Sequence, residues 1–217
     1  MKILVLFLLL LISCDHENLH GNKRFTRDIN QWVQTFESEE RDVYKHRTRM
    51  IDSLKIKKGE SVADIGAGTG AFLKLLSDKA GPTGKVYAID ISDKFVEHMK
   101  KRKVKENLEN LTVIKGETEK TTLPENIVDV VFICNTYHHF GDYQAMLSDI
   151  IKILKKNGRL SIVEFDKIPG KSRQWIMDHI RAEKKVFLNE IISAGFKYEG
   201  ESDIPFKENF MINFSKI

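Results

Sequence analysis

Short runs of apolar residues alternate with amphipathic segments over most of the chain. The runs at 61–65, 86–90, 111–115, 128–134 and 159–165 have the length and the β-branched content of buried strands. Most of the segments between them place apolar residues three and four positions apart, as in helices that cover a sheet. Strands that alternate with helices predict a parallel sheet whose right-handed crossovers place helices on both faces.

Both ends of the chain add further elements to this pattern. Apolar residues recur at helical spacing over 29–36, and Ser38 is expected to cap a second helix after it. A helix at about 182–194 and strands near 196–200 and 210–216 follow the fifth strand, and the last two could form a hairpin at the sheet edge. We therefore predict an α/β fold: a doubly wound, mostly parallel seven-stranded sheet (Rossmann-like) with an antiparallel C-terminal strand and N-terminal helices.

The first residues do not belong to this fold. Ten apolar residues, Ile3–Ile12, follow the positive Lys2. As a helix they would reach about 15 Å, roughly half of a bilayer's hydrocarbon core, which fits a secretory signal rather than a spanning helix. The end of the run, Leu11–Cys14, resembles the lipobox of bacterial lipoproteins, in which cleavage leaves the cysteine as the lipid-bearing first residue. An uncleaved apolar tail or a misassigned start codon is the competing interpretation.

This resemblance implies a three-part organisation: a lipoprotein signal peptide at 1–13, a tether at 14–27 and a folded domain at 28–217. The membrane would be reached through lipidated Cys14. Asp15 resembles the inner-membrane retention signal of some bacterial lipoproteins, which implies the outer face of the inner membrane in the cell envelope.

The net charge and the cysteine content limit which binding partners and disulfides can be expected for this chain. The net charge of +4 is too small to indicate a nucleic-acid partner. If Cys14 is lipidated, Cys134 has no second cysteine with which to form an intrachain disulfide.

A glycine-rich turn follows the first predicted strand. Gly66, Gly68 and Gly70 in DIGAGTG remove side chains where the backbone turns sharply and approaches a ligand. Asp90 ends the next strand, where a carboxylate can accept hydrogen bonds from both hydroxyls of a ribose. In a doubly wound sheet ligands bind beyond these strand ends, so the combination indicates a nucleoside-containing ligand.

Two kinds of nucleoside cofactor fit this turn. Gly66, Gly68 and Ala71 also satisfy the dinucleotide pattern, with Asp90 twenty residues after Gly70. Asp64 argues against a dinucleotide, because an acid is poorly placed beside a pyrophosphate but suits a cationic ligand. Only about fifty residues follow the fifth strand, too few for the substrate domain that a dehydrogenase normally adds.

The stretch Asp64–Gly70 resembles motif I of the class I S-adenosylmethionine-dependent methyltransferases, and Asp90 matches their ribose-binding acid. The resemblance covers roughly 40–217. It implies methyl transfer from S-adenosyl-L-methionine to a small-molecule or lipid-associated acceptor. Two alternatives stay open: an exported nucleoside-binding protein of this fold without catalysis, and a short NAD-dependent oxidoreductase.

The resemblance also implies roles for individual residues around the cofactor. The glycine turn would lie under the methionyl part, Asp64 would organise the turn or meet the amino group, and Asp90 would hold the ribose. The predicted cofactor-binding residues are Asp64, Gly66, Ala67, Gly68, Gly70, Asp90, Ile91 at the adenine, Glu117 after the third strand and Asn135 after the fourth.

Histidines and acids at the later strand ends are the catalytic candidates. His138 and His139 follow the fourth strand, and Glu164 ends the fifth. Histidine is the natural proton acceptor near pH 7, and a base is needed only if the methyl acceptor carries a proton. Adjacent residues point in different directions, so at most one of the two histidines is expected to face the pocket. The pair would chelate a metal poorly, and no metal site is predicted.

The remaining candidates lie where methyltransferases usually build the substrate wall or the N-terminal cover. His179 joins His138 and Glu164 as a catalytic candidate. Substrate contacts are predicted for His139, Asp166, Arg181 and Tyr44. Hydrogen-bonded loop histidines, ordinary loop acids, a surface salt bridge for Arg181 and a core position for Tyr44 are the competing interpretations.

Overall fold

The computed structural model describes residues 28–217. The predicted signal peptide, Cys14 and the tether up to residue 27 lie outside the described residues, so their roles stay predictions. Within the described part of the chain, no helix is both long and apolar enough to cross a bilayer.

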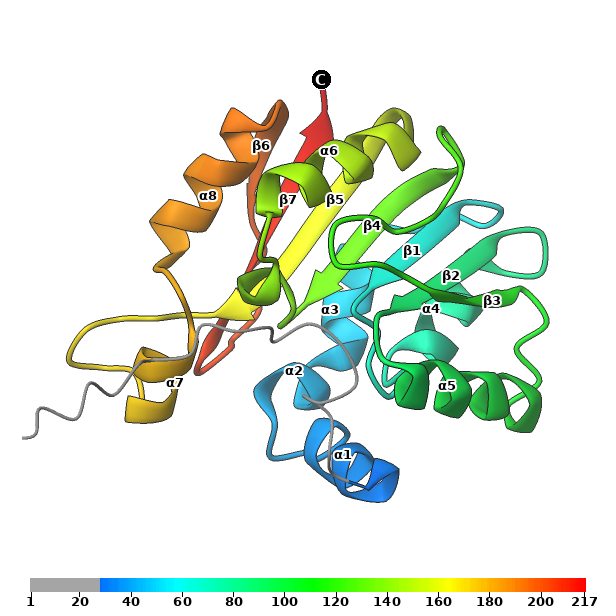
Figure 1. Ribbon diagram of the computed structural model, residues 1–217, viewed down its shortest axis with the longest axis horizontal. Helices are drawn as coiled ribbons and strands as arrows, with labels where there is room; N and C mark the ends of the chain where they lie inside the picture. The colour runs from blue at the N-terminus through cyan, green and yellow to red at the C-terminus, as the bar shows by residue number, and fades with distance from the viewer. Residues whose placement is uncertain (1–27) are drawn as a thin grey trace, which may run out of the picture.

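Seven strands form one sheet in the order β3-β2-β1-β4-β5-β7-β6 (Figure 1). β1 to β5 are parallel, and β7 lies antiparallel between β5 and β6. This arrangement confirms the predicted mostly parallel sheet and the pairing of the last two strands. The strands are β1 (Ser61–Ile65), β2 (Lys85–Asp90), β3 (Leu111–Lys115), β4 (Val128–Cys134), β5 (Leu154–Phe165), β6 (Phe196–Glu201) and β7 (Asn209–Lys216).

Helices cover both faces, as the alternation of strands and helices predicts (Figure 1). Successive strand residues point to opposite faces, so Ile133 packs in one core and Phe132 in the other. The first core joins the sheet to α6 (Tyr143–Ile153), α7 (Gln174–His179) and α8 (Lys184–Ser193). The second joins it to α2 (Asp42–Lys45), α3 (Arg47–Ser53), α4 (Leu73–Ala80) and α5 (Asp93–Lys105).

The N-terminal region differs from the prediction in one respect. α1 (Ile29–Phe36) forms as expected, and Asp28 caps it by accepting a hydrogen bond from the backbone N–H of Asn30 at 2.8 Å. The second helix is split into α2 and α3 at His46, and its N-cap is Arg41 rather than Ser38. The Ser38 hydroxyl instead accepts from the backbone N–H of Glu40, in a local turn before α2.

The site lies at the carboxyl edge of the sheet. Strand order reverses between β1 and β4, which is where doubly wound sheets bind ligands. α1, α2 and α7 lie beyond this edge (Figure 1), and a short 3-10 helix, η2 (Tyr137–His139), follows β4 directly. α7 is a helix that the sequence did not predict.

Candidate active site

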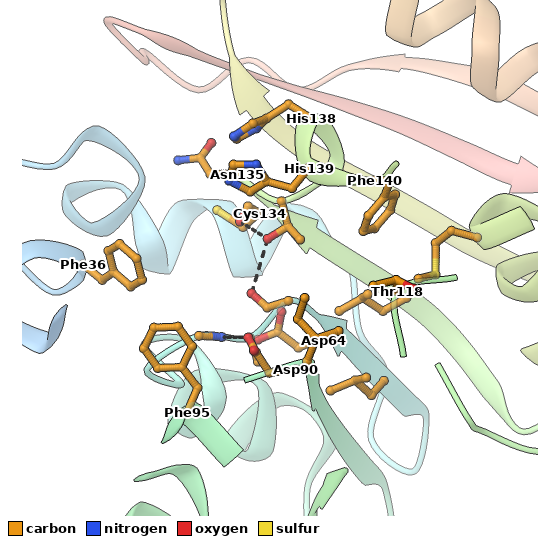
Figure 2. A pocket seen from close by; sticks show the side chains of 18 of the residues that line it. Phe36, Asp64, Asp90, Phe95, Thr118, Cys134, Asn135, His138, His139 and Phe140 are labelled. Atoms are coloured by element: carbon orange, nitrogen blue, oxygen red, sulfur yellow. Dashed lines mark hydrogen bonds between the residues drawn. The ribbon is translucent and has the colours of Figure 1, made fainter. Parts of the chain in front are cut away.

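A cavity of about 760 Å³ opens beyond the carboxyl ends of β1, β2 and β4. Figure 2 shows Asp64 and Asp90 on one side of it and Asn135, His138 and His139 on the other. Its volume lies within the range of small-molecule sites, which are about 300–1,000 Å³. The cavity therefore has two differently equipped halves, one after β1 and β2 and one after β4.

The glycine turn is held open by backbone conformation. Gly66 and Gly68 have φ of +75° and +56°, a region that side chains disfavour. A Cβ on Gly66 would lie 2.8 Å from Thr136 Cβ, so the turn after β1 packs directly on the segment after β4. Both glycines and Ala67 line the cavity, as predicted.

Gly70 corrects part of the predicted cofactor set. It does not line the cavity, and a Cβ there would meet Leu73 Cδ1 at 2.7 Å and Met99 Cγ at 3.2 Å. The missing side chain makes room for packing between α4 and α5. Gly70 therefore supports the turn from below instead of facing a ligand.

Asp90 joins the turn to the next strand end. Its Oδ2 accepts a hydrogen bond from the Gly68 N–H and its Oδ1 accepts one from Ser92, both at 2.8 Å. Burial raises the pKa of Asp90, and the hydrogen bonds from Ser92 and Gly68 oppose that shift. Each carboxylate oxygen keeps a further lone pair, so Asp90 can still accept hydrogen bonds from a ligand in the cavity.

Asp64 is an unpaired acid in the same half. Only 1% of the residue is exposed, and its Oδ2 has no hydrogen-bond partner among the described residues. Burial, and secondarily the charge of Asp90, raises the pKa of Asp64 to about 8. A buried acid without a partner is costly, so the position favours a ligand that brings a donor or a positive charge.

The other predicted cofactor residues also line the cavity: Ile91, Glu117 and Asn135. Asn135 adopts φ of +50°, and its Oδ1 accepts a hydrogen bond from Asn209 at 2.8 Å. Its Nδ2 is buried without a partner among the described residues. Asn135 therefore presents a donor to the cavity while Asn209 fixes the side-chain orientation.

A buried carboxylate–histidine pair dominates the second half. His138 Nδ1 lies 2.8 Å from Glu164 Oε2, and the two side chains are 2% and 0% exposed. Glu164 also accepts backbone hydrogen bonds from His138 and Phe165. Glu164 does not line the cavity itself but lies behind His138, which does. It can therefore orient the imidazole, and its predicted direct catalytic role becomes a positioning one.

His179 reaches the same point from α7. Its Nε2 lies 3.2 Å from His138 Nε2, and Trp175 stacks on its ring with centroids 5.0 Å apart. His139 also lines the cavity, and its ring centroid is 3.8 Å from that of His138. The expectation that only one of the adjacent histidines faces the pocket is wrong, because the tight turn of η2 brings both rings to one side.

Three predicted substrate residues have other surroundings. Tyr44 and Asp166 lie outside the cavity lining: the Arg47 guanidinium packs over the Tyr44 ring at 4.0 Å, and Asp166 lies 3.9 Å from Lys184. Arg181 lines the cavity but forms a bidentate ion pair with Glu190, with both contacts at 2.7 Å. The competing salt-bridge interpretation therefore holds for Arg181.

Arg41 and Phe36 are among the cavity residues that the sequence did not predict. The half-buried Arg41 lines the cavity just before α2, and burial lowers its pKa while nearby Cys134 and Glu164 oppose that shift. Phe36 lies over the glycine turn, 3.5 Å from where a Gly68 side chain would begin. Neither residue belongs to a sequence motif. The only sequence signal for Phe36 is the apolar face of α1, which indicates that the residue packs against the rest of the protein.

The first half, together with Asn135 from the second, fits the cofactor that the glycine motif implies. Besides Asp64 Oδ2 and Asn135 Nδ2, the hydroxyl of Thr69 is buried in the lining without a partner among the described residues. An acceptor, a donor and a hydroxyl match the ammonium and carboxylate groups of a methionyl moiety. Asp90 lines the cavity beside these groups, with acceptor capacity left for hydroxyl groups.

Comparisons with known proteins agree with this assignment. Residues 56–202 match the family model described as Methyltransferase domain. The chain is 26% identical over 128 residues to a demethylmenaquinone methyltransferase of Listeria monocytogenes serotype 4a, covering 58% of this chain and 54% of the relative. It is 32% identical over 123 residues to the ubiquinone/menaquinone biosynthesis C-methyltransferase UbiE of Pasteurella multocida, covering 54% and 44%. The chain thus spans about half the length of the curated relatives it matches.

A solved structure extends the likeness to the whole fold. A SAM dependent methyltransferase from Aquifex aeolicus superposes with a TM-score of 0.78 at 23% identity, covering 88% of this chain and 100% of that one. The family match spans more than half of the sequence and includes β1 to β5 with the glycine turn. The chain therefore belongs to the methyltransferase-domain family, and S-adenosylmethionine is the cofactor that its cavity accommodates.

Proposed function

We propose that this protein transfers a methyl group from S-adenosylmethionine to a small hydroxylated acceptor of the quinol type, with His138 as the general base. The observation that carries the proposal is the carboxylate-backed His138 facing the same cavity as Asp64 and Asp90. A base is needed only for an acceptor that loses a proton, so this pair favours a hydroxyl-bearing acceptor over a soft one such as a thiolate.

The first half of the cavity binds and orients the cofactor. Asp90 would accept hydrogen bonds from the ribose hydroxyls, Asp64 would meet the ammonium group, and Asn135 would donate to the carboxylate. S-adenosylmethionine supplies a methyl group on a sulfonium, which is displaced in line, so the protein mainly has to position and desolvate the reactants.

The second half handles the proton. With its Nδ1–H donated to Glu164, His138 directs the lone pair of Nε2 toward the cavity and His179, which would have to give up its contact with Nε2 when the acceptor binds. Nε2 would take the proton of the acceptor hydroxyl as electron density moves to the acceptor atom that attacks the methyl carbon, and the bonding electrons of the methyl group leave with the sulfur. Each turnover therefore moves one methyl group to the acceptor and releases one proton, and the charge of Glu164 stabilises the imidazolium formed in between.

The acceptor class rests on the relatives and on the cavity wall. Two of the matched relatives are named as quinone-pathway methyltransferases. The lining combines aromatic and apolar side chains such as Phe36, Phe140 and Met146 with the cation of Arg41. Such a wall suits an apolar ring that carries an acidic hydroxyl, since the arginine can stabilise the oxygen anion.

Calorimetry with S-adenosylhomocysteine tests the cofactor assignment, with NAD as the rival ligand. We expect S-adenosylhomocysteine to bind and NAD to give no heat. Asp90→Ala should lower the affinity about 100-fold, because it removes the ribose acceptor and the anchor of Gly68. Asp93→Asn, at the exposed start of α5, is the matched control and should keep wild-type affinity. Binding of NAD instead, or full affinity in Asp90→Ala, would refute the assignment.

We also propose that lipidated Cys14 holds the domain on the outer face of the bacterial inner membrane, where a lipid-associated acceptor would be within reach. The support is the lipobox-like Leu11–Cys14 and the following Asp15. Palmitate labelling with membrane fractionation tests it. Wild type should carry label and sediment with membranes, and Cys14→Ala should lose the label. An unlabelled wild-type chain would contradict the anchor.

A further inference from the structure

Three imidazole groups converge at the acceptor end of the cavity. His138, His139 and His179 each place a ring nitrogen within 4.8 Å of the other two. The first two come from η2, and the third comes from α7, some forty residues later in the chain. The sequence predicted no metal site because two adjacent histidines chelate poorly. The fold adds the third ring that makes a ligand set.

The spacing of the His138 and His179 nitrogens suits a tetrahedral metal. Two zinc–nitrogen bonds of about 2.0–2.1 Å at a tetrahedral angle hold their nitrogens about 3.3 Å apart. His138 Nε2 and His179 Nε2 are 3.2 Å apart. A direct N–H···N hydrogen bond between the rings would give a similar distance, so a test must distinguish the two arrangements.

Glu164 supplies the outer partner that such sites have. Metal-binding histidines almost always donate their other ring N–H to a carboxylate or a carbonyl, which fixes the ring and leaves the ligating nitrogen unprotonated. His138 Nδ1 meets Glu164 Oε2 at 2.8 Å in full burial, so the ring is oriented with Nε2 facing His179 Nε2 at 3.2 Å. Trp175 restricts the third ring by stacking on His179.

The surrounding charges permit a cation at this point. The charge of Arg181 is balanced by Glu190 at 2.7 Å, and Asp178 beside His179 also lines the cavity. Glu164 adds a buried carboxylate behind His138. Arg41 and Lys120 are opposing charges in the lining, and the charge of Glu164 acts on Arg41 as well.

We propose that His138, His139 and His179 form a binding site for a divalent transition metal of the zinc class, with its fourth position open to the cavity. Imidazole ligands suit zinc, cobalt, nickel and copper rather than magnesium or calcium. Three protein ligands and an open position leave room for water or an acceptor oxygen. A metal on His138 Nε2 takes the lone pair that the base needs, so the metal-bound and the methyl-transferring states exclude each other.

Cobalt binding to the full chain tests this site without acceptor or cofactor. The protein, free of any histidine tag, is stripped with chelator and titrated with Co²⁺, and the visible spectrum reports a tetrahedral nitrogen environment. We expect one Co²⁺ per chain, displaced by Zn²⁺. His179→Ala or His139→Ala should lower the affinity at least about 100-fold, and Glu164→Gln about 10–100-fold.

The matched control is His98→Ala, because His98 lies on α5 and does not line the cavity. It should bind as wild type does, and S-adenosylhomocysteine binding by each variant checks that it is folded. No tetrahedral cobalt spectrum, or wild-type affinity in both His139→Ala and His179→Ala, would overturn the metal site. Since S-adenosylhomocysteine binding does not involve these three rings, a failed metal test leaves the proposed methyl transfer standing, and the reverse also holds.

Discussion

The two halves of the cavity are built in different ways. The cofactor half comes from one stretch of the chain that runs from β1 through the glycine turn to β2. Its two acids, Asp64 and Asp90, lie at the carboxyl ends of these neighbouring strands. The acceptor half is assembled from four separate segments: Arg41 before α2, η2 after β4, Glu164 in β5 and His179 on α7. The first half is a local motif, whereas the second exists only once the chain has folded.

This difference separates what each half controls. In the cofactor half, backbone conformation and two buried acids decide affinity for a nucleoside ligand. In the acceptor half, side-chain contacts between distant segments decide whether a proton can be moved. Substitutions in one half should therefore change cofactor binding, and substitutions in the other should change turnover.

The largest separation is expected for His138→Ala. Losing the general base should lower turnover about 10²–10⁴-fold while S-adenosylhomocysteine affinity stays within about twofold. Radiolabelled methyl transfer to a quinol acceptor, with chelator present, measures the first quantity, and calorimetry measures the second. His98→Ala serves as the control. Unchanged turnover in His138→Ala would remove the base from the mechanism, and a large loss of cofactor affinity would erase the distinction between the halves.

An intermediate effect is expected for Gly66→Ala, because Gly66 is where the halves touch. Its φ of +75° disfavours a side chain, and a Cβ would also overlap Thr136. We expect a loss of about 1–3 kcal/mol in the free energy of unfolding, together with weaker cofactor binding. Denaturant titration measures the first.

Gly170→Ala provides the matched control. Gly170 has the same φ of +75°, but no atom lies within 4 Å of where its side chain would begin, so it reports backbone strain alone. A loss in Gly66→Ala that does not exceed the loss in Gly170→Ala would show that the contact with Thr136 has no energetic weight.

Asp64 should make the stability of the protein depend on pH. Its folded pKa of about 8 exceeds the ordinary 3.8, so the folded state holds a proton that the unfolded state has lost. Between these values stability falls as pH rises. Asp64→Asn cannot ionise, so its Tm should exceed that of wild type near pH 8, and the difference should shrink toward pH 4.

Binding of the cofactor should relieve the unfavourable burial of Asp64 and thereby increase the cofactor affinity. Below pH 8, the ammonium group of S-adenosylhomocysteine should displace the Asp64 proton, which calorimetry detects as heat that depends on the buffer. Asp64→Asn should lose this proton release, whereas Asp52→Asn, at an exposed position of α3, should retain it. A wild-type heat independent of the buffer would show that Asp64 is already ionised or does not meet the ligand.

Most of the sheet was predictable because its strands are contiguous apolar runs. The start of α5 follows from local sequence as well, since Ser92 is a short polar residue before an amphipathic segment and caps the helix. α7 was missed because six residues are too few to carry a periodic signal. The cofactor half was predictable from DIGAGTG and Asp90. Arg41 was not, since it acquires its place only when α2 closes over the strand ends, and the approach of His179 to His138 likewise depends on tertiary packing.

Thr136 makes the two halves of the cavity interdependent. Its side chain fills the space beside Gly66, its hydroxyl lies 3.3 Å from the Gly66 carbonyl, and it stands two residues before His138. Cofactor binding that restricts the motion of the glycine turn should therefore also restrict the segment after β4 that orients His138. By thermodynamic reciprocity, cofactor and acceptor should raise each other's affinity by the same factor, measurable as the acceptor Kd with and without S-adenosylhomocysteine. Such cooperativity favours ordered binding, in which the cofactor enters first and its demethylated product leaves last.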